Sequence, residues 1–133
     1  MKETTKTALR AAAVLGVAVG LCVTGLIAAD AQNPIKDAMQ KYNKAPKGTD
    51  NTADKAGKGQ ATKEEIKGML AAYTAMASAK PPQGDEAKWK TQVAALVKAT
   101  EALDKGEAGA PEKFAKASDC KACHSEFRPA KKK

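Results

Sequence analysis

Histidine is the scarcest reactive residue in this sequence, with one among 133 residues. A single histidine excludes zinc sites built from three histidines, and any metal-binding pair of histidines on a helix. Aromatic residues make up only 4% of the chain, so aromatic packing cannot dominate its core. The length fits one domain. The mixture of 43% hydrophobic and 29% charged residues argues against disorder by charge repulsion.

The N-terminus has the pattern of an export signal. Three of the first ten residues are basic, and a 19-residue run without charge follows at 11–29. Ala29 and Ala31 offer small side chains at both positions that a signal peptidase reads, so we expect cleavage after Ala31. Residues 1–31 would then be a signal peptide, residues 32–133 the mature domain, and the protein periplasmic. The alternative is an uncleaved membrane anchor, because 19 apolar residues nearly span a bilayer.

The third cysteine, Cys22, belongs to this apolar run. Leu21 before it is too large for a lipoprotein processing site, so Cys22 should leave with the signal. The remaining 102 residues would hold Cys120 and Cys123 as their only cysteines and carry a net charge of +7.

The composition of residues 32–133 favours helices. This part contains 21 alanines but only two valines and two isoleucines, and β-branched residues are those that strands prefer. Helix starts are predicted at Asn33-Pro34, Thr62, Asp85 and Pro111, and ends near Pro46, Lys80-Pro81-Pro82, Gly106 and Pro129. Segment 47–61 is polar and glycine-rich, and is either a loop or a poorly packed helical piece.

Apolar residues recur at helical spacing within each predicted helix. They are Ile35, Ala38, Met39 and Tyr42; Ile66, Met69, Leu70, Tyr73, Met76 and Ala77; Trp89, Val93, Leu96, Val97, Thr100 and Leu103; and Phe114, Ala117, Cys120, His124 and Phe127. Amphipathic helices with mostly short loops predict an all-α fold, an antiparallel up-down-up-down four-helix bundle. The core has few large apolar residues, and such small domains often need a staple or a cofactor.

The chemistry is concentrated in Cys120-Lys121-Ala122-Cys123-His124. This C-x-x-C-H spacing is the attachment signature of c-type haem. Two thiols one helical turn apart can each form a thioether with a haem vinyl group, and His124 then becomes the proximal iron ligand. The free nitrogen of its ring should meet a hydrogen-bond acceptor. We therefore expect one haem c, covalently bound through Cys120 and Cys123.

Three other interpretations of the motif are weaker. A structural zinc site needs four protein ligands, and the mature chain offers two cysteines and one histidine. A thioredoxin-like pair follows a strand in a βαβ unit, and no such unit is expected here. A plain disulfide between Cys120 and Cys123 would leave the thin core unexplained.

The run CKACHSEFR at 120–128 resembles the class II cytochromes c, the cytochrome c′ family and its low-spin relatives. That family carries C-x-x-C-H-x-x-Tyr-Arg near its C-terminus, and Phe127 stands here in the tyrosine place. The resemblance implies a four-helix bundle, frequently a homodimer, with one haem between helices near one end. It also implies that Arg128 lies near the proximal face.

The resemblance further implies a sixth iron ligand, since low-spin members use a methionine early in the first helix and Met39 occupies that place. Helix geometry agrees, because Met39 is five residues after Pro34 and His124 five before Pro129, each about 7.5 Å from the same end. Met76 lies at a similar distance from this end of the bundle, whereas Met69 lies about two helical turns farther from it. Five-coordinate members lack this ligand. Trp89 begins the third helix at this end and could border the haem, although core packing explains it, Tyr42 and Tyr73 better.

These residues predict an electron carrier with a His/Met-ligated haem, and no enzymatic activity. The alternative is a five-coordinate protein that binds a small gas such as nitric oxide. Peroxidase chemistry lacks a distal histidine, because His124 is used on the proximal side. A redox protein, possibly acidic given the basic charge, is the expected partner. Nucleic acid is not expected, since export removes the protein from it and no aromatic–basic motif occurs.

Overall fold

The structure is a computed structural model that describes residues 33–130. Its helices are α1 (Pro34–Tyr42), α2 (Thr52–Gly57), α3 (Lys63–Ala77), α4 (Glu86–Lys105), α5 (Ala110–Ala117) and α6 (Cys120–Phe127). No strand occurs in this part of the chain, so the all-α prediction is confirmed. The predicted signal peptide, its cleavage site and Cys22 lie outside the described residues.

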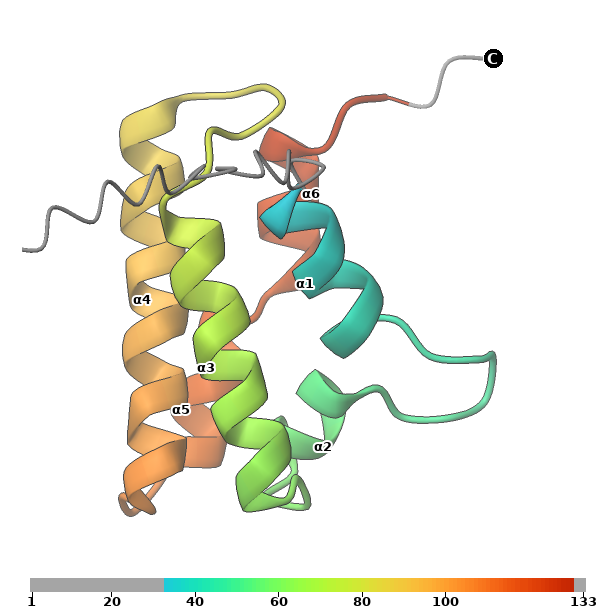
Figure 1. Cartoon of the computed structure of the whole chain (residues 1–133), viewed down its shortest axis with the longest axis vertical. Coiled ribbons are helices and arrows are strands. Elements are labelled where there is room, and N and C mark those ends of the chain that lie inside the picture. The colour runs from blue at the N-terminus through green and yellow to red at the C-terminus, as the bar shows by residue number, and fades with distance from the viewer. Residues whose placement is uncertain (1–32, 131–133) are drawn as a thin grey trace, which may run out of the picture.

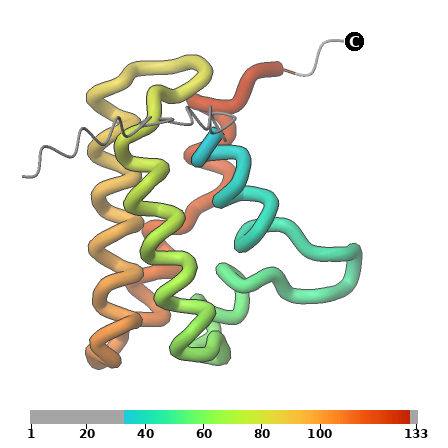
Figure 2. Tube along the Cα trace, viewed as in Figure 1, coloured from blue at the N-terminus to red at the C-terminus, as the bar shows by residue number. Residues whose placement is uncertain are grey.

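The two longest helices, α3 and α4, run along the long axis of the molecule in opposite directions (Figure 1). α1 packs against α3, and α5 packs against α4 and α2. Along the long axis, α1 and α6 lie toward one end, whereas α2 and α5 lie toward the other (Figures 1 and 2). The chain descends through α1, rises through α3, descends through α4 and rises again through α5 and α6 (Figure 2).

The predicted caps of the first three long helices are confirmed. Asn33 Oδ1 accepts hydrogen bonds from the N–H groups of Ile35 and Lys36 at the start of α1. Thr62 and Glu65 form the reciprocal capping box of α3. Asp85 caps α4, which ends at Gly106 with a φ of 68°, a left-handed conformation that glycine adopts without strain.

The core is formed by the apolar faces of these helices. Its largest fully buried side chains are Trp89, Tyr73, Phe114, Met69, Met76 and Thr100. Thr100 satisfies its buried hydroxyl by donating to Leu96 O over 2.8 Å. Leu70 and Val97, predicted for the same faces, are only half-buried.

Segment 47–61 contains both a loop and a short helix, the two structures expected from its sequence. It contains the short helix α2, which Asn51 and Asp54 begin with a reciprocal capping box. Ala53 and Ala56 bury the inner face of α2, and α2 packs mainly against α5. The small alanine side chains allow the two helices to approach closely. A search for large apolar residues at helical spacing does not detect such a helix.

The predicted fourth helix is wrong as a single element. It divides into α5 and α6, with Ser118 and Asp119 between them. The physical reason is Asp119, whose side chain accepts hydrogen bonds from Lys121 N and Ala122 N and so starts a new helix. The expected common apolar face is broken as well, because Phe114 and Phe127 are buried while Cys120 and His124 are exposed.

Candidate haem-attachment site

The five residues of the motif form the first part of α6, and a local cap fixes where that helix begins. Asp119 Oδ1 lies 3.0 Å from Lys121 N and 3.1 Å from Ala122 N. Cys120 is therefore the first residue of the helix, and Cys123 follows one turn later on a neighbouring part of its surface. His124 comes next and lies in the second turn.

Both cysteines of the motif are free thiols, in contrast to the disulfide interpretation. Cys120 is exposed, and its thiol donates to Ser118 O over 3.4 Å. Cys123 is half-buried against the edge of the core. Burial raises the pKa of the Cys123 thiol, and Cys120 and Glu126 add to the rise. The Cys123 thiol is therefore protonated at neutral pH.

His124 is exposed, and its carbonyl accepts a hydrogen bond from Arg128 N over 3.3 Å at the end of α6. No hydrogen bond to its ring forms among residues 33–130, so the expected acceptor for the ring nitrogen stays a prediction. Arg128 is the exposed residue that ends the helix. The structure thus brings Cys120, Cys123, His124 and Arg128 together on one short element.

The C-terminal end of α6 is held by the loop between α3 and α4, residues 78–85. Gln83 Nε2 donates to Glu126 O over 3.2 Å and to Arg128 O over 3.0 Å. Lys88 Nζ, at the start of α4, lies 3.0 Å from Glu126 Oε1. These contacts fix the turn that follows His124. The sequence interpretation missed them, because a glutamine in a Pro-Pro-Gln-Gly turn gives no signal of its distant partner.

Trp89 and Phe127 also hold the C-terminal end of α6 in place. Trp89 is 2% exposed, and its ring meets that of Phe127 edge-on with centroids 5.2 Å apart. Its indole N–H donates to Ala79 O over 2.9 Å. Gly84 has a φ of +85°, and a Cβ there would lie only 2.8 Å from Phe127 Cδ1. Trp89 is therefore a core residue that packs against the helix carrying the motif, and its place beside the haem stays a prediction.

The three methionines named as possible ligands differ in burial. Met69 and Met76 are 0% and 2% exposed within the core of α3. Met39, on α1, is only half-buried and packs against the edge of that core, as Ile35 and Cys123 also do. Met39 is thus the one of these three methionines that the core does not fully bury.

The donor set fits a covalently attached haem. Two free thiols lie one turn apart on a capped helix, and an exposed imidazole follows the second thiol directly. Among residues 33–130, no three His, Cys, Asp or Glu side chains gather as they would around a bare metal ion. Two shallow surface hollows lie elsewhere, one along α4 and α5 and the other beside α2, and the motif lines neither.

The chain matches no protein-family model, no curated protein and no solved structure. Within the described residues, no helix combines the length and apolarity needed to cross a membrane. The interpretation of the site therefore depends on the chemistry of its residues.

Proposed function

We propose that this protein is a periplasmic monohaem c-type cytochrome that carries electrons. One observation carries the proposal: α6 begins at Cys120 and presents two free thiols and an imidazole in the C-x-x-C-H order. The thiols of Cys120 and Cys123 would anchor the haem c, and His124 would bind its iron. When bound, the haem supplies a reversible one-electron change at its iron.

The arrangement of helices supports the proposal. We interpret the fold as an antiparallel four-helix bundle in which α5 and α6 together take the place of the fourth helix. α1 and α6 lie toward the same end of the long axis (Figure 1). That is the relation which a haem between the first and last helices requires. The C-terminal end of α6 would be held in place by Gln83, Lys88 and Trp89.

Met39 is our proposed sixth ligand. The single histidine is used on the proximal side, so a sixth protein ligand must be of another type. Met39 is half-buried at the edge of the core, whereas Met69 and Met76 are enclosed by it. A thioether ligand raises the reduction potential, and a six-coordinate iron changes its redox state with little rearrangement, which suits an electron carrier.

Replacing Met39 tests this ligand. Met39→Leu keeps the bulk and removes the sulfur, so we expect near-complete conversion of the low-spin spectrum to high-spin and a lower reduction potential. Visible spectra of both redox states and a potentiometric titration measure these changes. Met76→Leu is the matched control and should leave the spectrum low-spin.

Two results would contradict the Met39 assignment. A high-spin wild type that binds carbon monoxide rapidly when reduced would favour the five-coordinate, gas-binding alternative. Loss of the low-spin spectrum in Met76→Leu, but not in Met39→Leu, would show that the ligand is Met76 on α3.

A further inference from the structure

Tyr73 is a buried phenol that haem attachment does not use. It lies in the C-terminal half of α3 with 0% exposure, and its ring stacks on Phe114 of α5 with centroids 6.5 Å apart. Its hydroxyl donates to Asn43 Oδ1 over 3.0 Å and lies 3.9 Å from Met69 Sδ. Burying a hydroxyl is costly unless it is bonded, so the bond to Asn43 is part of what permits this position.

Asn43 connects three helices through three different groups. Its side chain accepts the Tyr73 bond from α3. Its N–H donates to Met39 O over 3.2 Å and so caps the end of α1. Its carbonyl accepts from Asn51 Nδ2, at the start of α2, over 3.4 Å. The Tyr73 hydroxyl therefore fixes the end of α1, and Met39 lies one turn before that end.

The Tyr73 hydroxyl resists ionisation. Burial is the largest cause that raises its pKa to about 12, the bond to Asn43 opposes this rise, and the Cys120 thiol adds to it. The hydroxyl therefore stays protonated at neutral pH and can donate to Asn43 Oδ1.

We infer, on the basis of the proposed function, that Tyr73 is a positioning residue for Met39. Its hydrogen bond to Asn43 holds the last turn of α1 so that the Met39 sulfur stays at the iron. Groups that orient a metal ligand affect binding strongly although they do not touch the metal, and their loss commonly weakens it 10–100-fold. Without the bond, α1 gains freedom and the sixth position opens more often.

The test is Tyr73→Phe in the haem-loaded protein, a change that removes one oxygen and keeps the ring. Tyr42→Phe is the matched control, because Tyr42 is also buried and its hydroxyl makes no hydrogen bond among the described residues. We expect carbon monoxide to bind reduced Tyr73→Phe about tenfold faster than wild type, because binding requires release of Met39. A high-spin fraction should appear in its oxidised spectrum. Asn43→Ala should do the same, and the double variant should add little to either change.

The outcomes separate the inference from the proposed function. Equal carbon monoxide rates in wild type, Tyr73→Phe and Tyr42→Phe would overturn the inference and leave haem attachment intact. A wild type that is already high-spin would overturn it together with Met39 ligation. A chain without covalent haem would instead overturn the proposed function itself.

Discussion

Single hydrogen-bonding atoms fix both ends of α6 and the position of the Tyr73 hydroxyl. Asp119 Oδ1 starts α6 at the first cysteine of the motif, and Gln83 Nε2 fixes its far end through two carbonyls. The Tyr73 hydroxyl donates to Asn43 Oδ1 over 3.0 Å, with Met69 Sδ as a weaker acceptor 3.9 Å away. A buried phenol in this position resists ionisation, because its anion would lose hydration without gaining a cation.

Stability at high pH should report on this phenol. Burial raises the pKa of Tyr73 from 10.0 to about 12 in the folded protein. A raised pKa gives stability that is complete below pH 10 and is lost as the pH rises toward 12. We therefore expect the free energy of unfolding to fall over this range in wild type, and to fall less in Tyr73→Phe. Urea unfolding at several pH values measures it. Parallel curves for the two proteins would contradict the prediction.

At the scale of elements, α6 is a separate short helix docked by its C-terminal end. Lys88 forms an ion pair with Glu126, and Trp89 packs on Phe127. The ion pair is largely exposed, so the buried contact between Trp89 and Phe127 contributes more to docking than the ion pair does. The N-terminal turn, which carries the cysteines, has its own cap.

Gly84 gives a direct test of this docking. Gly84→Ala should bring a Cβ against the Phe127 ring, whose nearest atom would be 2.8 Å away. Gly48→Ala is the control, because Gly48 has a similar φ of +89° and no atom within 4 Å. The control should lose about 1–2 kcal/mol through backbone strain alone. Gly84→Ala should lose about 1–3 kcal/mol more through the clash. Equal losses in urea unfolding would show that α6 does not pack closely at Gly84.

The caps of α1, α3 and α4 could be predicted because their signals are local. In each, a side chain accepts a hydrogen bond from a backbone N–H within three residues along the chain. The break at Asp119 was equally local, and the apolar spacing from Phe114 to Phe127 concealed it. Tyr73 with Asn43, and Gln83 with Glu126, could not be predicted, because each joins residues that are far apart in sequence. The motif was evident because its chemistry requires adjacent residues.

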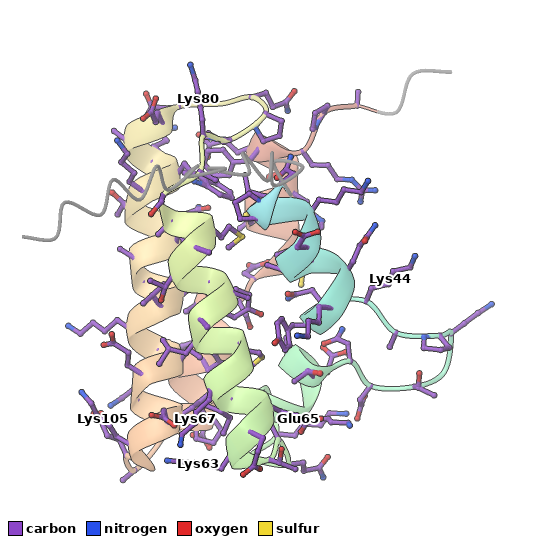
Figure 3. All side chains as sticks on the ribbon, viewed as in Figure 1. Lys44, Lys63, Glu65, Lys67, Lys80 and Lys105 are labelled. Atoms are coloured by element: carbon purple, nitrogen blue, oxygen red, sulfur yellow. The ribbon has the colours of Figure 1, made fainter. Side chains whose placement is uncertain are left out.

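At the scale of the whole molecule, lysines occur at both ends of the long axis (Figure 3). Lys80 lies at one end of the long axis, whereas Lys63, Lys67 and Lys105 lie at the other (Figure 3). At least one of these lysines is paired, because Lys63 Nζ lies 3.3 Å from Asp104 Oδ1. Under the proposed function, unpaired lysines would attract an acidic redox partner over distance. The expected acidic partner and the possible homodimer remain predictions.

The proposed function depends most on covalent haem at Cys120 and Cys123. The decisive measurement is the mass and absorption spectrum of the denatured protein after production with haem-attachment machinery. We predict that the chain gains the mass of one haem and keeps its haem absorption after denaturation, and that Cys120→Ala/Cys123→Ala loses both. A wild-type chain with neither the added mass nor the absorption would contradict covalent haem attachment and with it the proposed function.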